Sequence, residues 1–338
     1  MRRNKKNQTA EYTVADGNIL EVKDLRVNIK VDDYELNAVR GVSFSMKKGE
    51  TLGLVGESGC GKSVTSLSIM QLLQRPQGQV VEGEIRLNLG DKAYDVTKAP
   101  DSVMQHLRGN FVSMIFQEPM TALNPVFRIG DQLNEVLTLH NEEGLNKEQI
   151  KERTIQLLEM VGIANSEGVY KNFPHELSGG MRQRVMIAMA LACNPRLIIA
   201  DEPTTALDVT IQAQILELMQ DLQKKLGMAV ILVTHDLGVI ADMCDNIIVM
   251  YGGRICERGT AREIFYNPKH EYTKGLLRSI PSVNNMKKKL VPIAGPPINM
   301  LNLPAGCAFC TRCDAAMKIC LTEHPDELTI NENHKAAC

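Results

Sequence analysis

The chain has 338 residues, a net charge of −2 and 44% hydrophobic residues, a composition typical of a soluble globular protein with one large domain or two to three modest ones. Tryptophan is absent and aromatic residues make up only 4%, so neither base stacking nor a basic surface points to a nucleic-acid-binding protein. No stretch reaches the roughly 18 consecutive apolar residues of a membrane-spanning helix, so we expect any membrane role to be peripheral.

The N-terminal region predicts a flexible start followed by β structure. The basic segment Met1–Lys6 lacks a following apolar stretch, so it does not look like a secretory signal. We expect residues 1–18 to form a solvated tail rather than an arm for membranes or nucleic acids. Apolar and polar residues alternate in parts of Ile19–Val31, Val42–Met46 and Gly83–Leu89, the pattern of half-buried strands.

A phosphate-binding loop follows the second of these strands. Gly56–Ser63 reads GESGCGKS and fits the pattern G-x-x-x-x-G-K-[ST]. Thr51–Val55 before it predicts a buried strand and Val64–Leu73 after it a helix, so backbone N–H groups and a helix N-terminus would cradle phosphates. Lys62 would neutralise phosphate oxygens, and Ser63 would place its hydroxyl on Mg²⁺. Motif and context together disfavour the alternative, an ordinary glycine-rich turn.

The second half of the chain alternates helices and strands. Residues 131–162 have a helical pattern, and a second helix runs from Ile211 to near Gly227. Leu197–Ala200 and Ala229–Val233 read as buried strands, and Ile247–Glu257 as a hairpin with two central glycines. This order predicts an α/β fold with a largely parallel sheet and an inserted helical subdomain.

Charged and small residues lie where this fold places ligands. Asp201 and Glu202 end a buried strand, where Asp201 would hold Mg²⁺ and Glu202 would polarise an attacking water. The alternative is a capping pair that opens the turn at Pro203. Ser178–Gly180 precede an apolar helix, Val185–Ala192, whose N-terminus could receive an anion. A plain helix cap is the alternative there, and both readings can hold.

These segments, in this order, resemble the ATPase subunit of ABC transporters over about residues 19–265. The resemblance implies an ABC-type P-loop ATPase core with an N-terminal antiparallel β subdomain and an inserted helical subdomain at about residues 118–180. The matching motifs are Gly56–Ser63 (Walker A), Gln117 in FQEP (Q-loop), Leu177–Gln183 in LSGGMRQ (signature), Leu197–Glu202 (Walker B), Ala206–Asp208 (D-loop) and His235 in THD (switch histidine).

The resemblance assigns a role to each motif. Glu202, His235 and Gln117 would be catalytic, with His235 bonded to the γ-phosphate and Gln117 coupling the site to a membrane subunit. As a lone residue, His235 would more simply be an ordinary strand-end histidine. The residues implied to bind ATP are Gly56, Glu57, Ser58, Gly59, Cys60, Gly61, Lys62, Ser63 and Val64; those implied to bind Mg²⁺ are Ser63, Gln117 and Asp201.

Two further sets of residues complete this implied site. The signature would contact the ATP of a second subunit in a head-to-tail dimer, together with Asp208 of the D-loop. Tyr34 is the nearest candidate to stack on adenine, and a plain surface tyrosine is an equal alternative. The signature residues are Leu177, Ser178, Gly179, Gly180 and Gln183.

The nine cysteines are unevenly distributed. Cys60, Cys193, Cys244 and Cys256 are scattered, the last three as expected packing residues, and five lie between residues 307 and 338. In a reducing compartment, such a cluster suggests a metal before a disulfide.

The segment around these cysteines, with LPAGCAF at residues 303–309 and AGPP at 294–297, resembles the tail of oligopeptide and dipeptide importer ATPases. In relatives with four such cysteines, the tail holds a [4Fe–4S] cluster, which implies Cys307, Cys313, Cys320 and Cys338 as ligands. Cys310 departs from the family pattern and could replace a neighbour. Zn²⁺ and free thiols are the alternatives.

The sequence as a whole therefore predicts a tail at residues 1–18, an ABC ATPase domain at 19–265 and a cysteine-rich extension at 266–338. The resemblance implies an ATP-hydrolysing subunit of an oligopeptide or dipeptide importer at the cytoplasmic face of the membrane. Its partners would be a second, different ATPase, two transmembrane permeases and an extracellular substrate-binding protein, with no nucleic acid. A nickel importer and a soluble ABC ATPase are the alternatives.

Overall fold

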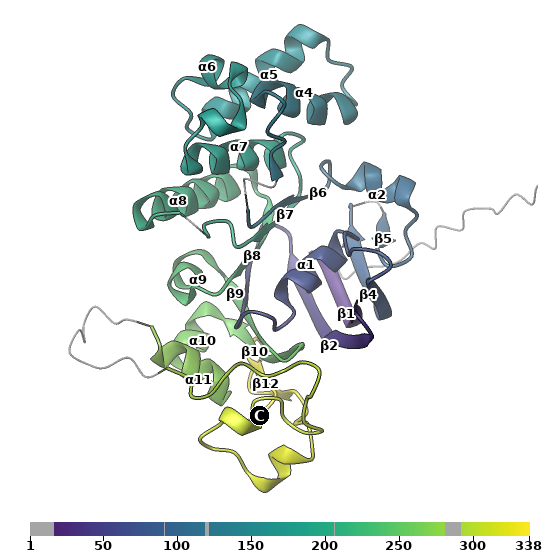
Figure 1. Ribbon diagram of the computed structural model, residues 1–338, viewed down its shortest axis with the longest axis vertical. Coiled ribbons are helices and arrows are strands. Elements are labelled where there is room, and N and C mark those ends of the chain that lie inside the picture. Colours follow the sequence, from purple (N-terminus) through teal and green to yellow (C-terminus); the bar gives the residue numbers. More distant parts are fainter. Residues whose placement is uncertain (1–16, 91, 119–121, 206, 281–291) are drawn as a thin grey trace, which may run out of the picture.

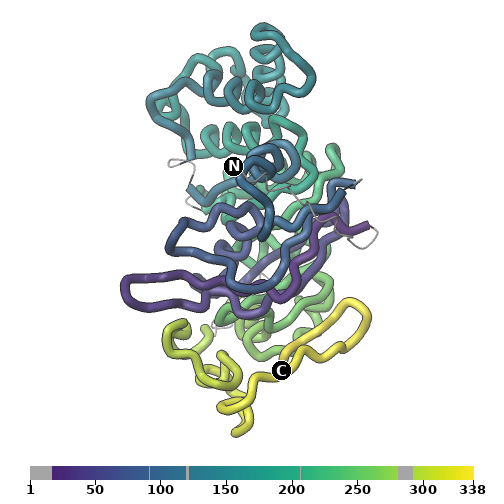
Figure 2. The backbone as a smooth tube through the Cα atoms, turned by 90° about the vertical axis from the view of Figure 1, so that its right-hand side faces the viewer, coloured from purple at the N-terminus to yellow at the C-terminus, as the bar shows by residue number. Residues whose placement is uncertain are grey.

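The structure, a computed structural model, describes residues 17–90, 92–118, 122–205, 207–280 and 292–338. It contains a four-stranded antiparallel sheet, a larger mixed sheet, a helical block at one end and a cysteine-rich extension at the other (Figures 1 and 2). The predicted N-terminal tail falls almost wholly in residues 1–16, outside the described residues. Asn18, which that prediction included, already begins the first strand.

The smaller sheet confirms the predicted N-terminal antiparallel subdomain. Its strand order is β2-β1-β4-β5, and β1 pairs antiparallel with both β2 and β4. Leu20 and Val22 of β1 are buried, as are Leu25 and Val27, because alternate residues of a strand point to the same face; an irregularity in the pairing between Val22 and Leu25 keeps both pairs buried. The strands are β1 (Asn18–Val31), β2 (Tyr34–Lys47), β4 (Gly78–Asn88) and β5 (Ala93–Asp95).

The larger sheet has the order β11-β12-β10-β9-β3-β8-β7-β6. Its middle strands are parallel and fully buried, which explains their continuous apolar sequences. The parallel strands are β3 (Thr51–Val55), β6 (Val112–Ile115), β7 (Leu197–Asp201), β8 (Ala229–Thr234) and β9 (Asn246–Tyr251). The antiparallel strands are β10 (Arg254–Thr260), β11 (Leu328–Thr329) and β12 (Lys335–Ala336).

Helices cover the sheet and form the block above it. Figure 1 shows α4 to α7 together above the sheet, with α10 and α11 near β10 and β12 at the other end. The α-helices are α1 (Lys62–Ile69), α2 (Asp101–Leu107), α4 (Ile129–Leu139), α5 (Lys147–Met160), α6 (Ser166–Lys171), α7 (Gly179–Leu191), α8 (Val209–Leu226), α9 (Leu237–Met243), α10 (Ala261–Tyr266) and α11 (Glu271–Arg278). The 3₁₀ helices are η1 (Pro174–Glu176), η3 (Cys310–Arg312) and η4 (Lys318–Leu321).

Two buried clusters lie on the two faces of the larger sheet. In β7, Leu197 and Ile199 pack with the antiparallel sheet, whereas Ile198 and Ala200 pack with the helical side. The two-residue period of a strand sends neighbours to opposite faces, so each central strand contributes to both clusters. A central strand that is packed on both faces holds the residues after its carboxyl end in fixed positions.

Two expected helices differ from those observed. The helical pattern over 131–162 is two helices, because Asn146 caps α5 in a reciprocal capping box with Gln149. The helix expected to run from 64 to 73 begins at Lys62 and ends at Ile69. Gln71 then takes a positive φ of 50° while its side chain donates hydrogen bonds to two carbonyls near residue 97. This end is set by tertiary contacts that no local pattern reveals.

The extension is joined to the rest of the fold by main-chain pairing. Glu257 of β10 pairs with Ala336 of β12, so the end of the chain adds strands to the central sheet. His334 and Glu257 are both fully buried, and the His334 Nε2 atom lies 2.7 Å from Glu257 Oε1. The domain boundary expected at residue 265 therefore does not divide the sheet, because β11 and β12 beyond it belong to the same sheet as β10. No helix among the described residues has the length and apolar character to cross a membrane.

Candidate nucleotide site

The phosphate loop connects β3 to α1 and is closed by its own lysine. Lys62 is 5% exposed, and its Nζ atom donates to the carbonyls of Gly56 at 2.7 Å and Glu57 at 3.1 Å. These carbonyls hold a buried cation inside the loop. The ammonium group is therefore already desolvated at the place where an anionic ligand would meet it.

Glycines in the loop are required for different reasons. Gly56 has a φ of 153°, and a Cβ there would lie 2.3 Å from the main-chain oxygen of Met250. Gly61 has a φ of 103°, and its Cβ would lie 2.6 Å from the Ala38 oxygen. Gly59 also has a positive φ, of 79°, but no atom lies within 4 Å of its would-be Cβ. The first two allow close packing, and the third supplies only backbone conformation.

A buried carboxylate stands beside the loop hydroxyl. The Ser63 Oγ atom donates to Asp201 Oδ1 at 3.1 Å, and Asp201 is 6% exposed at the end of β7. Burial raises the pKa of Asp201 and the charge of Glu202 raises it further, while Ser63 and Lys62 act in the opposite direction. Two adjacent oxygens, one on a desolvated carboxylate, fit the oxygen donor set that Mg²⁺ prefers.

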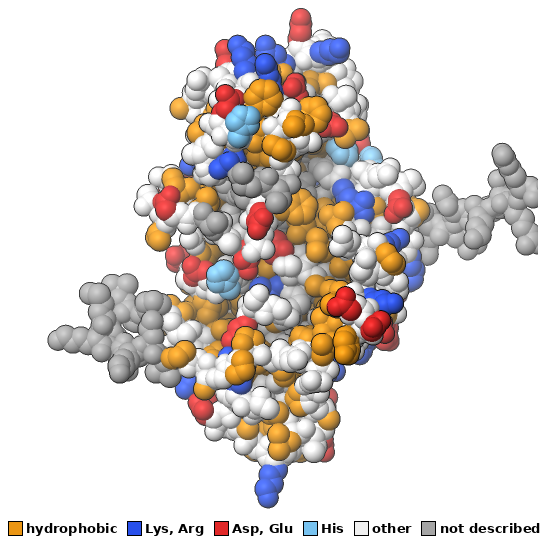
Figure 3. All heavy atoms as spheres, viewed as in Figure 1, with side chains coloured by type: hydrophobic (Ala, Val, Ile, Leu, Met, Phe, Trp, Pro, Cys, Tyr) orange, Lys and Arg blue, Asp and Glu red, His pale blue; other side chains and the backbone are white. Residues whose placement is uncertain are grey.

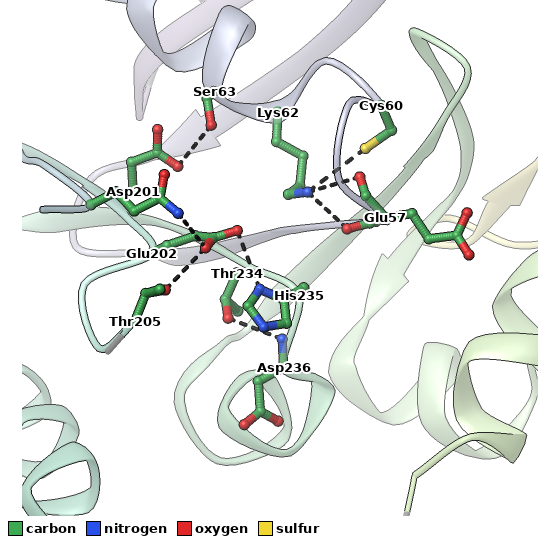
Figure 4. A network of polar contacts seen from close by, with 12 residues as sticks. Glu57, Cys60, Lys62, Ser63, Asp201, Glu202, Thr205, Thr234, His235 and Asp236 are labelled. Atoms are coloured by element: carbon green, nitrogen blue, oxygen red, sulfur yellow. Dashed lines mark hydrogen bonds and ion pairs between the residues drawn. The ribbon is translucent and has the colours of Figure 1, made fainter. Parts of the chain in front are cut away.

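Three polar side chains of the site contact the carboxylate of Glu202. Its backbone has a positive φ of 47°, and its N–H donates to the Val233 oxygen at 2.8 Å. Gln117 Nε2 donates to Glu202 Oε2 at 2.9 Å, and Thr205 Oγ1 donates to the same oxygen at 3.0 Å. His235 Nδ1 lies 3.2 Å from the other oxygen, Oε1 (Figure 4). The three residues expected to be catalytic therefore meet at one carboxylate.

A cleft of about 590 Å³ joins the loop to this carboxylate. Acidic and histidine side chains gather near the middle of the face shown in Figure 3, between the helical block and the extension. A volume of this size is typical of a small-molecule site. The lining residues are Ile29, Leu36, Ala38, Glu57, Ser58, Gly59, Gly61, Lys62, Ser63, Val64, Gln117, Glu202 and His235.

The apolar side of the cleft comes from the antiparallel sheet. Ile29 of β1 and Leu36 and Ala38 of β2 line it, and no sequence motif marks them as site residues. Tyr34 begins β2, is 64% exposed and is not among the lining residues, so its stacking role stays a prediction. Gly56, Cys60 and Asp201 are not among the lining residues.

The signature segment lies away from this cleft. Ser178 caps α7 by accepting a hydrogen bond from the Met181 N–H at 3.3 Å, as expected for a helix cap. A Cβ on Gly180 would lie 2.8 Å from Ile211 Cγ2 of α8, so this glycine permits a close helix contact. Asp208 caps α8 through the Ile211 N–H. Leu177 and Gln183 are buried, and neither they, Gly179 nor the other signature residues described line the cleft.

The cysteines of the extension share one neighbourhood. The Cys307 N–H donates to the Cys320 oxygen at 2.8 Å, which brings two distant segments together. Burial raises the pKa of Cys307, and the thiols of Cys310, Cys320 and Cys338 raise it further. Within the described ranges, however, no group of three or more His, Cys, Asp or Glu side chains is placed to hold a metal ion. Cys244 and Cys256 are buried, as expected of packing residues.

Comparison with known proteins establishes the family. Residues 39–205 match the family model described as ABC transporter, and residues 256–320 match the one described as oligopeptide/dipeptide transporter, C-terminal region. The chain is 51% identical to the oligopeptide transport ATP-binding protein OppD of Bacillus subtilis over 94% of this chain and 87% of the relative. This chain belongs to the ABC transporter ATP-binding family.

Other relatives and solved structures agree with this assignment. The dipeptide transport ATP-binding protein DppD of Bacillus subtilis is 47% identical, and OppD of Salmonella typhimurium 46%, each over 95% of this chain and 94% of the relative. The dimeric cassette MJ0796 in a post-hydrolysis state with ADP and phosphate aligns with a TM-score of 0.64 and 28% identity, covering 72% of this chain and 99% of that one. The predicted ABC ATPase fold is thereby confirmed, and the chain is an ATPase.

Some contacts of this ABC ATPase site were not anticipated from sequence. Thr205 donates a hydrogen bond to Glu202, three residues before it in the chain. This spacing is typical of a turn, so the sequence that follows Glu202 could have indicated the contact. Tyr272 and Arg312 contact Glu57 of the phosphate loop from the extension. Because they are 215 and 255 residues away in sequence, no local pattern indicates them.

Proposed function

We propose that the chain is the ATP-hydrolysing subunit that energises an ABC importer of oligopeptides or dipeptides. The observation that carries the proposal is the meeting of Gln117, His235 and Glu202 at the mouth of the phosphate-loop cleft. The names of the relatives supply the transported class: oligopeptide transport for OppD and dipeptide transport for DppD.

The residues of the cleft divide the work of hydrolysis. Lys62 would leave the loop carbonyls to neutralise phosphate oxygens, and Ser63 and Asp201 would hold Mg²⁺, which neutralises developing charge on the phosphates. Glu202 would orient and polarise the attacking water, since a fixed carboxylate within hydrogen-bonding reach is what general-base catalysis needs. His235 and Gln117 hold this carboxylate and would face the γ-phosphate and the metal.

The complete enzyme would be a dimer of ATPase subunits. Support comes from the position of the signature residues outside the chain's own cleft, and from the dimeric state named for the MJ0796 cassettes. Ser178 and Gly180 would then face the γ-phosphate on the partner, so that ATP closes the dimer and hydrolysis reopens it. We propose a second, related ATPase as that partner.

The remaining components follow from the importer proposal. Two transmembrane permease subunits would dock near Gln117 and the helical block, and an extracellular protein would deliver the peptide. The chain itself would be peripheral on the cytoplasmic face of the membrane. Nucleic acid has no part in this scheme.

We also propose a [4Fe–4S] cluster in the extension. Its ligands would be Cys307, Cys313, Cys320 and Cys338, with Cys310 as the alternate. The influence of Cys310, Cys320 and Cys338 on the pKa of Cys307 and the main-chain hydrogen bond between Cys307 and Cys320 support it. When bound, the cluster would serve as a structural clip. Anaerobic purification followed by assay of iron, acid-labile sulfide and zinc tests this, and zinc or an absence of metal would contradict it.

Uptake by cells that lack the gene tests the transport proposal. Such cells, complemented with the wild-type chain, should regain uptake of a radiolabelled tripeptide, and the Glu202→Gln variant should not restore it. A parallel assay with ⁶³Ni²⁺ separates the rival substrate. Restored nickel uptake without restored peptide uptake would replace the peptide assignment while leaving the ATPase in place.

A further inference from the structure

The cysteine-rich extension holds one residue of the phosphate loop at two points. Tyr272 Oη accepts a hydrogen bond from the Glu57 main-chain N–H at 2.7 Å. Arg312 donates to both carboxylate oxygens of Glu57, from Nη1 at 2.6 Å and from Nη2 at 3.0 Å. This is a bidentate ion pair, which is stronger than a single hydrogen bond and also fixes the orientation of the carboxylate. The loop thus has a clamp made by residues outside its own motif.

The arginine of this clamp is itself fixed in place. Its Nε atom donates to the Ala294 oxygen at 2.9 Å, and Nη1 also donates to Tyr251 Oη at 3.2 Å. The guanidinium lies 5.9 Å from the ring centres of Tyr251 and Phe309. The Arg312 side chain is only 6% exposed. A buried cation held by four hydrogen bonds keeps its partner in one orientation.

The carboxylate of Glu57 is separate from the reacting groups. Figure 4 shows it pointing away from Asp201, Glu202 and His235. Its own main-chain oxygen accepts from Lys62 Nζ, so the residue that Arg312 holds also positions the phosphate-binding lysine. An unpaired carboxylate in this loop would repel the phosphates of a nucleotide, and Arg312 neutralises it.

We propose that Arg312 is a positioning residue of the ATP site, which sets nucleotide affinity by orienting and neutralising Glu57. The inference rests on ATP binding at the phosphate loop, as in the proposed function. Arg312 acts through Glu57 and is not itself a catalytic residue. Its loss should therefore weaken binding of Mg·ATP and leave the chemical step nearly unchanged.

A double-mutant cycle tests this in the full-length chain. The variants are Arg312→Gln, Glu57→Gln and the combination of the two, each in the Glu202→Gln background so that Mg·ATP binding is titrated without turnover. Arg312→Gln alone should weaken binding on the order of tenfold, as for charged groups in direct contact. In the Glu57→Gln background the same change should weaken it less than about twofold.

Kinetics with an intact Glu202 supply the second readout. Arg312→Gln should raise KM for ATP while kcat stays within about twofold, because the interaction is the same in the ground and transition states. Arg312→Lys keeps the charge without the fork and should fall between wild type and Arg312→Gln. Arg258→Gln is the matched control, because Arg258 pairs with Glu327 of the extension and does not touch the loop.

The outcomes are distinguishable from failure of the proposed function. If no variant binds Mg·ATP, including the parent, the ATP site itself is wrong. If the parent binds but Arg312→Gln binds equally well, or weakens binding equally with and without Glu57, the positioning role is overturned. If Arg312→Gln does not fold, the comparison uses Arg312→Lys and the double variant with Glu57→Gln, in which both charges are removed. Equal affinity of Arg312→Lys and wild type for Mg·ATP would then show that the bidentate guanidinium is not required.

Discussion

The Gln117 amide donates a hydrogen bond to the Glu202 carboxylate at 2.9 Å, across 85 residues of sequence. Gln117 follows β6 and Glu202 follows β7, which are parallel neighbours in the sheet. Because the carboxyl ends of the two strands lie at the same edge of the sheet, the two side chains meet although they are far apart in sequence. We therefore expect a displacement of Gln117 to change a hydrogen bond of Glu202.

Replacement of Glu202 by glutamine should separate binding from hydrolysis. The amide keeps the size and the contact with Thr205 but cannot polarise water as a carboxylate does. We expect Mg·ATP binding within about threefold of wild type and turnover lower by two or more orders of magnitude, roughly 10²–10³. Phosphate release and equilibrium binding measure the two effects. Glu217→Gln, on the exposed face of α8, is the control, and near-normal hydrolysis by Glu202→Gln would refute the assignment.

Removal of the Ser63 hydroxyl should act mainly on the metal. Ser63→Ala removes one of the two oxygens proposed to hold Mg²⁺ and the hydrogen-bond donor that orients the other, on Asp201. We expect the Mg²⁺ concentration for half-maximal ATP hydrolysis to increase by roughly tenfold, with recovery at high Mg²⁺. Ser68→Ala, on the same helix but bonded to the Val64 oxygen, should leave the titration unchanged. An unaltered Mg²⁺ requirement in Ser63→Ala would argue against this metal site.

Alanine at two glycines of the loop should have unequal effects. At Gly56 the new Cβ meets the Met250 main chain at 2.3 Å, and backbone must move to admit it. At Gly59 the space is open and only the positive φ opposes the change, at about 1–2 kcal/mol. Urea unfolding should show a clearly larger loss for Gly56→Ala, about 3 kcal/mol or more. Equal losses in the two variants would mean that packing against Met250 is not what requires glycine.

Acid should destabilise the fold through His270. Burial lowers the pKa of His270 to about 4, and its Nδ1 atom accepts a hydrogen bond from the Tyr272 N–H. The unfolded chain takes up a proton near pH 6.5 that the folded chain refuses until about pH 4. Stability is therefore full above about pH 6.5 and falls between there and pH 4, by at most about 1.4 kcal/mol per pH unit.

The His270→Asn variant checks this assignment. Asparagine can still accept the Tyr272 N–H at the start of α11 but does not titrate. Between pH 7.5 and 5, its free energy of unfolding should depend less on pH than that of wild type. Some dependence should remain, because burial also lowers the pKa of His140 and His324. An identical pH profile in wild type and variant would show that His270 is not the responsible group.

The sequence predicts most residues of the candidate site because these residues lie in short local motifs. The run 56–63 and the pair Asp201-Glu202 each combine a strand with the polar residues that follow it, and the fold brings such strand ends to one edge. Similarly, Gly227 and the pair Gly252-Gly253 predict a helix end and a hairpin because positive φ values of 54° to 77° favour glycine. These predictions needed no knowledge of distant contacts.

What the sequence does not reveal depends on distant packing. The apolar wall of the cleft comes from Ile29 and Leu36, which are ordinary strand residues until the two sheets are placed together. Helix α1 ends where Gln71 bonds to carbonyls beyond β5, a tertiary contact that overrides helical pattern. The clamp on Glu57 is of the same kind, since nothing local in the sequence links Tyr272 or Arg312 to the phosphate loop.

The separation of Glu57 and Arg312 by 255 residues also has a consequence in time. At a synthesis rate of roughly 5–20 residues per second, the arginine is added on the order of 10–50 s after the glutamate. Throughout that interval the nascent phosphate loop carries an unneutralised carboxylate. A chain cut short by premature termination or proteolysis before residue 312 would lack this neutralisation, and we expect it to bind ATP more weakly than the full-length chain.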